Sequence, residues 1–232
     1  MSATPQTLSN RDLRQREIVP PEKLARCHAV VIGVGAIGRQ VALQLAAVGI
    51  GSMALVDFDL VEEVNLAPQA YRGEDIGLAK VEATASVCRS FHPQIKLRLF
   101  QERFRRSSAR MMLSPQTGAT DIAVFACVDS ITTRGLIWEA VHEQVAFFAD
   151  GRMSAETLRV LASDHPSSDS HYPTTLFAAE EAYVGSCTGK STVYTGSIAA
   201  GFMLSQFTRW LRGMPVDRDV MLNLLSMELV VG

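Results

Sequence analysis

The chain has 232 residues, of which 47% are hydrophobic and 20% are charged, and its formal net charge is −2 at pH 7. This composition is typical of a globular protein with a full apolar core, and the small net charge gives no indication of nucleic acid or an anionic membrane as a partner. Because no apolar run approaches the roughly 18 residues of a membrane span, and the polar start has no signal-peptide core, we expect a cytoplasmic protein.

Residues 1–28 are expected to form an N-terminal arm ahead of one α/β domain that spans residues 29–232. The segment Asn10–Arg26 is rich in basic residues, among them Arg11 and Arg14. One interpretation is a solvated helix followed by a turn. The other is an arm that reaches the anion site of another subunit.

The stretch that follows has the pattern of a strand–helix–strand unit. The apolar run Ala29–Ile32 predicts a buried parallel strand. Apolar residues at helical spacing predict a helix over Arg39–Val48, and Met53–Val56 predicts the next strand. This order favours a Rossmann-like fold, in which a mostly parallel twisted sheet carries helices on both faces.

A glycine-rich turn joins the first strand to the helix with the spacing G-x-G-x-x-G. Gly33 permits a tight turn, Gly35 lets the backbone approach a phosphate, and Gly38 allows close packing of the helix. The helix N-terminus directs unpaired N–H groups toward an anion. The second strand delivers Asp57 and Asp59 to its tip, where Asp57 can accept hydrogen bonds from a ribose. The unit predicts a nucleotide site without specifying the nucleotide.

Residues 60–80 are too polar, and too often interrupted by proline and glycine, for a regular element. We expect a long loop at the carboxyl edge of the sheet, where open α/β folds bind ligands. A helix follows over Leu78–Phe91, with Lys80 in its first turn. A lysine there opposes the helix dipole, so it indicates either a nearby anion or a solvated surface side chain.

The remaining elements alternate and then change direction. Strands are expected at Ile95–Phe100 and Asp121–Cys127, helices at Ser107–Leu113, Ile131–Gln144 and Ser191–Leu211, an antiparallel pair at Val145–Ala149 and Glu156–Leu161, a turn-rich segment at Ser163–Thr175, and a final strand pair within Val220–Val231. Asp129 follows a buried strand, so it can cap the next helix or hold a cation beside a phosphate.

Taken together, these motifs resemble the adenylyltransferases of the ThiF/MoeB type, which activate ubiquitin and ubiquitin-like sulfur carriers. The arm motif Arg-Tyr-x-Arg-Gln of that family is similar to Arg11–Gln15, with Asp12 in place of the tyrosine. The other matching segments are Val56–Asp59, Asn65–Gln69, Gly77–Lys80, and Asp129 together with Arg134.

The resemblance implies a reaction in which the C-terminal carboxylate of a substrate attacks the α-phosphate of ATP, giving an acyl-adenylate and pyrophosphate. The substrate would be a ubiquitin-like protein, a sulfur carrier or a peptide. Because the reaction concentrates negative charge around the triphosphate, the site residues position and neutralise rather than react.

The same resemblance assigns a role to each matching residue. The implied set is nucleotide binding by Gly33, Gly35, Gly38 and Gln69, ribose binding by Asp57 with Asp59 beside it, phosphate contacts from Asn65 and Lys80, Mg²⁺ binding by Asp129, and an Arg14 that reaches in from the second subunit of a homodimer.

One position departs from the family pattern, because the arginine of the Asn-Leu-x-Arg-Gln loop is replaced by Pro68. Arg72, four residues further on, could supply that charge. The departure keeps a non-catalytic nucleotide-binding scaffold open as an alternative. An NAD(P)-dependent oxidoreductase is the other alternative. Such an enzyme would need only the glycine turn, so it would leave the other matching motifs unexplained.

The four cysteines lie far apart and form no C-x-x-C pair, so neither a disulfide framework nor a structural zinc is indicated. The resemblance implies that Cys187, in the variable loop before the last helix, takes the acyl group as a thioester or forms a persulfide. A cysteine near a helix N-terminus tends toward the thiolate. The alternative is an inert packed thiol.

Overall fold

The computed structural model describes residues 10–115, 117–177 and 191–232. They form an eight-stranded sheet in the order β3-β2-β1-β4-β5-β6-β7-β8. The parallel strands are β1 (Cys27–Ile32), β2 (Ser52–Val56), β3 (Lys96–Phe100), β4 (Asp121–Ala126) and β5 (Phe147–Ser154), and the antiparallel strands are β6 (Thr157–Ser163), β7 (Asp219–Asn223) and β8 (Glu228–Val231). The predicted Rossmann-like sheet with an antiparallel C-terminal extension is confirmed.

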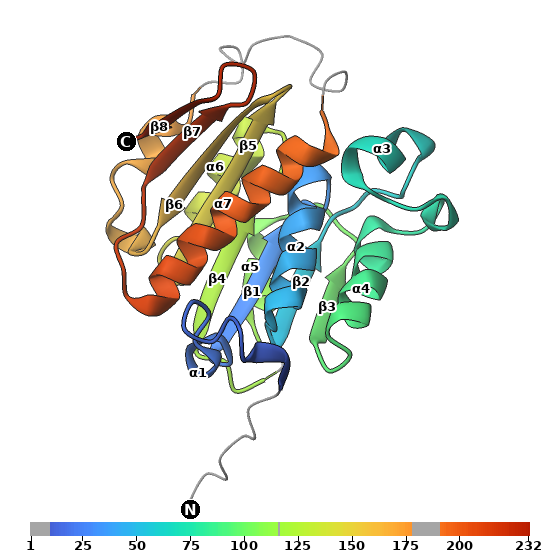
Figure 1. Cartoon of the computed structure of the whole chain (residues 1–232), viewed down its shortest axis with the longest axis horizontal. Coiled ribbons are helices and arrows are strands. Elements are labelled where there is room, and N and C mark those ends of the chain that lie inside the picture. Colours follow the sequence, from blue (N-terminus) through green and yellow to red (C-terminus); the bar gives the residue numbers. More distant parts are fainter. Residues whose placement is uncertain (1–9, 116, 178–190) are drawn as a thin grey trace, which may run out of the picture.

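Helices cover both faces of the sheet (Figure 1). One face packs against α2 (Ala36–Val48), α4 (Lys80–Phe91) and α7 (Val193–Arg212). The other packs against α5 (Arg106–Leu113) and α6 (Ile131–Val141). Because side chains alternate along a strand, Ala29 and Val31 of β1 face the first layer, whereas Val30 and Ile32 face the second. In the described part of the chain, no helix combines the length and the apolar character that crossing a membrane requires.

The expected loop over residues 60–80 contains short helical elements, so the prediction of no regular structure there is wrong. A 3-10 turn at Glu63–Asn65 leads into α3 (Leu66–Gln69), and a second 3-10 turn spans Gly73–Asp75. Side chains close both turns, because Asn65 Oδ1 accepts the Glu62 N–H at 2.9 Å. The Asp75 carboxylate likewise accepts the Arg72 N–H at 2.8 Å. Such local side-chain bonds compete with longer elements and are not visible as periodicity.

Most other predicted elements differ from the structure by only a few residues at their ends, but two segments differ more. β5 continues to Ser154, because its end pairs with β6 as far as Thr157. The N-terminal segment is not one solvated helix: it holds a 3-10 turn at Asn10–Asp12 and the short α1 (Pro21–Leu24), and Val19 and Leu24 join the core beside α2.

Candidate functional site

The glycine-rich turn lies between the carboxyl ends of β2 and β4. Gly33 has a φ of +86°, a backbone conformation that favours glycine, and its N–H donates to the Val56 carbonyl at 2.8 Å. A Cβ atom on Gly33 would lie 2.7 Å from the Cys127 carbonyl oxygen, and a Cβ on Gly38 would overlap the carbonyl oxygen of Gly33. The turn and the first turn of α2 are therefore packed so closely that both positions require glycine.

Asp57, at the end of β2, is bonded to this turn. Its Oδ2 accepts the Val34 N–H at 2.6 Å, and its Oδ1 accepts the Asp59 N–H at 2.9 Å. Asp57 is 9% exposed, and burial raises the pKa of its carboxyl although both backbone bonds and the charge of Lys80 act to lower it. The carboxylate is thus held in a partly dry position at the edge of the sheet where an α/β fold binds its nucleotide.

Lys80 lies in the first turn of α4 and is not a solvated surface lysine, because only 6% of it is exposed. Its Nζ lies 3.0 Å from Asp59 Oδ2, and its backbone N–H donates to the Asp59 carbonyl at 3.0 Å. The Asp59 side chain is 44% exposed. The lysine is therefore fixed at the tip of β2, beside Asp57.

The loop that carries α3 covers the glycine turn. Gln69 Oε1 is buried without a hydrogen-bond partner among the described residues, and it lies 4.0 Å from the position that a Cβ on Gly35 would occupy. Asn65 closes the turn before α3 through its own side-chain oxygen. The structure therefore brings Gln69 to the glycine turn and places Asn65 on the same loop.

Arg72 is directed toward its sequence neighbours. Its guanidinium forms ion pairs with Asp75 at 2.9 Å and with Glu74 at 2.6 Å. The hydrogen bond that Arg72 donates to Asp75 is the largest cause that raises the pKa of Arg72. Two carboxylates therefore pair with this guanidinium, and the predicted role of Arg72 in place of the missing loop arginine stays a prediction.

Asp129 follows β4 at the same edge of the sheet as the glycine turn. Ser130, not Asp129, caps α6, because Ser130 Oγ accepts the Thr133 N–H at 3.2 Å. The capping interpretation of Asp129 is therefore wrong. The Asp129 side chain is exposed and forms no hydrogen bond or ion pair with the described residues, which leaves its carboxylate available to a ligand.

Sequence reasoning missed a buried charge cluster behind Asp129. Arg134 forms an ion pair with Asp150, and it also donates to the Val128 and Gly151 carbonyl oxygens. Burial and the charge of Arg152 lower the pKa of Arg134 to about 10. Arg134 is thus a buried structural cation that contacts the backbone next to Asp129.

Asp150 is the centre of that cluster and is fully buried. Its Oδ2 accepts from Arg152 Nε at 2.8 Å and from the Tyr172 hydroxyl at 3.0 Å. Arg152 donates further to the Thr175 carbonyl at 2.9 Å. The cluster therefore ties the turn-rich segment after β6 to the middle of β5. The available sequence signal was the string Asp150-Gly151-Arg152 immediately after an apolar run.

A second missed group, Arg39 with Tyr71, lies under the α3 loop. Arg39 is 2% exposed, and its guanidinium stacks on the Tyr71 ring at 4.1 Å from the centroid. The Tyr71 hydroxyl donates to the Val34 carbonyl at 2.7 Å. The only sequence signal was a charged residue one position after the last glycine of the turn.

The arm lies at the opposite edge of the sheet from the glycine turn of its own chain. Arg11 donates to the Ala46 and Ala47 carbonyls at 2.7 and 2.8 Å, and Gln15 donates to the Val48 carbonyl at 2.9 Å. These carbonyls end α2, whose other end begins at the turn, and Figure 1 shows α1 and α3 at opposite ends of the molecule. Arg14 is exposed on this segment, so it does not reach the Asp57 of its own chain.

Cys187 lies outside the described residues, as do most of the residues just before it, and its predicted role stays a prediction. Cys27 and Cys88 are buried, and Cys127 is half-buried. Burial raises the pKa of each of these three thiols to about 12, so all are protonated and inert at neutral pH.

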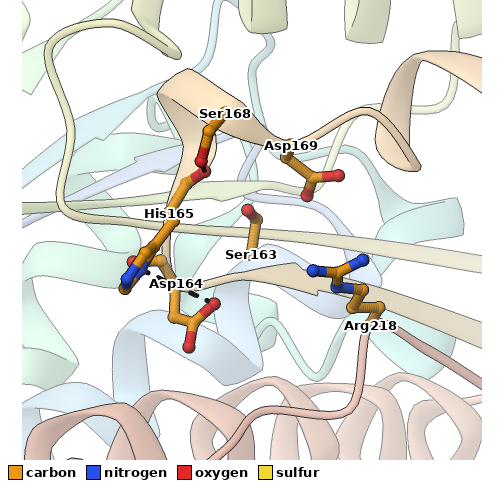
Figure 2. A pocket seen from close by; sticks show the side chains of 6 residues that line it. All are labelled: Ser163, Asp164, His165, Ser168, Asp169 and Arg218. Carbon is orange, nitrogen blue, oxygen red and sulfur yellow. Dashed lines mark hydrogen bonds and ion pairs between the residues drawn. The ribbon is translucent and has the colours of Figure 1, made fainter.

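A polar pocket of about 280 Å³ lies away from the glycine turn (Figure 2). It is lined by Ser163, Asp164, His165, Ser168, Asp169 and Arg218. Ser163 ends β6 and pairs with Phe148 near the start of β5, so the pocket belongs to the amino edge of the parallel strands. None of the predicted site residues lines it.

Comparison with known proteins gives one family and several relatives. The model of the ThiF family matches residues 10–229. The probable adenylyltransferase/sulfurtransferase MoeZ of Mycobacterium tuberculosis is 36% identical over 89 residues, which are 38% of this chain and 23% of that protein. The adenylyltransferase and sulfurtransferase MOCS3 of Bos taurus is 32% identical over 143 residues, covering 57% of this chain and 30% of that protein. The chain thus spans less than a third of the length of these two relatives.

Solved structures show the same fold at low sequence identity. PaaA superposes with a TM-score of 0.77 at 21% identity and covers 100% of this chain and 76% of its own. MccB of E. coli, in a structure with AMPCPP and MccA, superposes with a TM-score of 0.75 at 14% identity and covers 97% of this chain and 72% of its own. A further MccB structure contains ATP.

Proposed function

The chain belongs to the ThiF family, and from this premise we propose that it uses ATP to adenylate the C-terminal carboxylate of a small ubiquitin-like, sulfur-carrier or peptide substrate, with release of pyrophosphate. The observation that carries the proposal is the convergence of the glycine turn, Asp57 and Lys80 at one edge of the sheet. MoeZ and MOCS3 are named as adenylyltransferases, and MccB has structures with ATP and with MccA.

The geometry supports a separate role for each group around the nucleotide. Asp57 accepts the ribose hydroxyls, because its carboxylate has lone pairs beyond the two that its backbone partners use. The N-terminus of α2 and the Gly35 backbone face the phosphates. Lys80, oriented by Asp59, provides positive charge where the attacking carboxylate would otherwise be repelled by the phosphates.

The residues present fit a magnesium ion that is shared with the substrate. Mg²⁺ in nucleotide sites usually keeps several waters and binds one or two carboxylates together with phosphate oxygens. The exposed Asp129 can supply one such carboxylate, whereas no group of three or more His, Cys, Asp or Glu in the described residues could hold a metal alone. When bound, the ion would neutralise phosphate charge.

The position of the arm supports a homodimer in which Arg14 acts on the site of the other subunit. Within its own chain, the segment is anchored by Arg11 and Gln15 at the carboxyl end of α2, far from the α2 N-terminus. An exposed arginine at this end of α2 can serve a nucleotide site of this kind only in another molecule.

The test is ATP–pyrophosphate exchange with Mg·ATP, labelled pyrophosphate and small proteins that end in glycine and are encoded near this gene. We expect substrate-dependent exchange in the unmodified chain. The exchange rate should fall at least about tenfold in Lys80→Met and stay unchanged in Lys23→Met, the control at an exposed lysine. Measured ATP binding without exchange for any candidate would favour the non-catalytic scaffold.

A further inference from the structure

Arg39 is a buried cation without a buried anion. It lies in the first turn of α2, one residue after the glycine turn, and only 2% of it is exposed. Its Nη1 donates to Thr84 Oγ1 at 3.2 Å and its Nη2 to the Ala70 carbonyl at 3.1 Å, while its Nε is buried without a partner. Among the described residues it forms no ion pair with a carboxylate.

The cost of this arrangement distinguishes Arg39 from the other buried arginine. Burying a charge costs several kcal/mol unless it is paired, and Arg134 meets that requirement with Asp150. Asp75 is the carboxylate whose charge acts on Arg39, but it already forms an ion pair with Arg72. A hydrophobic residue would fill the space under Tyr71 at lower cost. The retained charge therefore points to a role toward an anion at the adjacent turn.

The contacts of Arg39 connect the parts of the predicted phosphate site. The Ala70 carbonyl belongs to a residue in the left-handed conformation, with a φ of +58°, directly after Gln69. The Tyr71 ring lies under the guanidinium, and its hydroxyl donates to the Val34 carbonyl between Gly33 and Gly35. One side chain thus links α2, α4 and the α3 loop around the glycine turn.

We propose that Arg39 is a positioning residue for the triphosphate. It fixes the loop that contains Asn65 and Gln69 against the glycine turn, and its own positive charge stays uncompensated beside that turn. The inference rests on the proposed nucleotide site, but it concerns binding and not the transfer step. Arg39 should therefore contribute more to the affinity for ATP than to the affinity for adenosine, because the anchored loop and the positive charge act on phosphates, whereas Asp57 acts on the ribose.

The experiment compares the affinities of the full chain for ATP and for adenosine by titration calorimetry. Arg39→Met keeps the length of the side chain without its charge or donors, and we expect its Kd for ATP to rise at least about tenfold while its Kd for adenosine changes less than about twofold. Arg39→Lys retains the charge and should recover ATP affinity to within about threefold of the original.

The matched control is Arg98→Met. Arg98 also stacks on an aromatic ring, Phe100, at 5.0 Å and donates to two backbone carbonyls, but it lies on the edge strand β3, away from the turn. Its removal should leave both affinities unchanged. If Arg39→Met does not fold, the near-isosteric Thr84→Val removes one acceptor of the guanidinium and should selectively weaken ATP binding by a few fold.

Equal losses of ATP and adenosine affinity, or no loss of either, in folded Arg39→Met would overturn the inference, because a purely structural support affects both ligands alike. Pyrophosphate exchange is measured separately on the unmodified chain. A chain that binds ATP selectively through Arg39 without exchange would refute the proposed reaction and retain this inference.

Discussion

The Asp57 carboxylate accepts the backbone N–H of Val34 at 2.6 Å, so the acid at the tip of β2 is bonded directly to the glycine turn after β1. Its second oxygen accepts the Asp59 N–H, and Asp59 in turn pairs with Lys80. The glycine turn, Lys80 and Asp57, which we propose binds the ribose, therefore form one connected unit.

Asp57→Asn should weaken ATP and adenosine equally, by about tenfold, because the ribose is common to both ligands. An asparagine offers one acceptor oxygen to two backbone donors, and its amide N–H₂ would face one of them. Titration calorimetry with both ligands checks this, with Asp164→Asn at the opposite edge of the sheet as the control. Unchanged adenosine affinity would show that Asp57 does not hold the ribose.

Gly38→Ala should prevent the native packing of α2, since the added Cβ would overlap the Gly33 carbonyl oxygen. Backbone cannot move aside as a flexible side chain can, so we expect a loss of about 3 kcal/mol or more in the free energy of unfolding. Gly51→Ala is the matched control, because nothing lies within 4 Å of the position its Cβ would take. Urea unfolding of both variants measures the difference, and equal stabilities would disprove the packing argument.

The strand–turn–helix unit could be predicted because all of its signals are local. Gly33, Gly35 and Gly38 lie within one turn of chain, and the flanking strands are short, uninterrupted apolar runs. Parallel strands place their carboxyl ends at a common edge, so the position of Asp57 beside the turn also followed. The ambiguity of Lys80 was resolved only by Asp59, 21 residues away in sequence.

The parts that were missed depend on pairings between distant segments. Arg39 and Ala70 are 31 residues apart, and Asp150 and Tyr172 are 22 apart. Nothing in the local pattern of either segment specifies its partner. The cap of α6 was missed for a different reason, because Asp129 and Ser130 are both good capping residues and the sequence does not distinguish adjacent candidates.

His28 should make the protein less stable in mild acid. Its imidazole is buried between the Ser52 hydroxyl, 2.7 Å from Nδ1, and the Met112 carbonyl, 3.2 Å from Nε2, and burial lowers its pKa. The unfolded chain takes up a proton below about pH 6.5 whereas the folded chain resists it. Stability is therefore lost as the pH falls from about 6.5 toward the lower folded pKa.

Urea unfolding at a series of pH values between 7.5 and 5 measures this loss. A single proton contributes at most about 1.4 kcal/mol per pH unit, and His28→Gln should remove that component of the slope. A variant that folds and keeps the original slope would show that His28 is not responsible.

Asp150→Asn should be the most destabilising single change in the charge cluster. Asp150 is the anion for both Arg134 and Arg152, and all three are well shielded from water. Removing one partner of a buried pair leaves uncompensated charge, which costs about 3–5 kcal/mol. Because Arg134 also holds the Val128 carbonyl beside Asp129, the variant should in addition require more Mg²⁺ for exchange.

Two changes calibrate that prediction by urea unfolding. Tyr172→Phe removes one hydrogen bond to the same carboxylate and should cost only about 1–2 kcal/mol. Asp219→Asn breaks the pair with Arg159, whose side chain is 36% exposed. Water can therefore solvate Arg159 when its partner is lost, and the cost should again be about 1–2 kcal/mol. If Asp150→Asn cost no more than these two, the buried arginines would not depend on Asp150 for their charge balance.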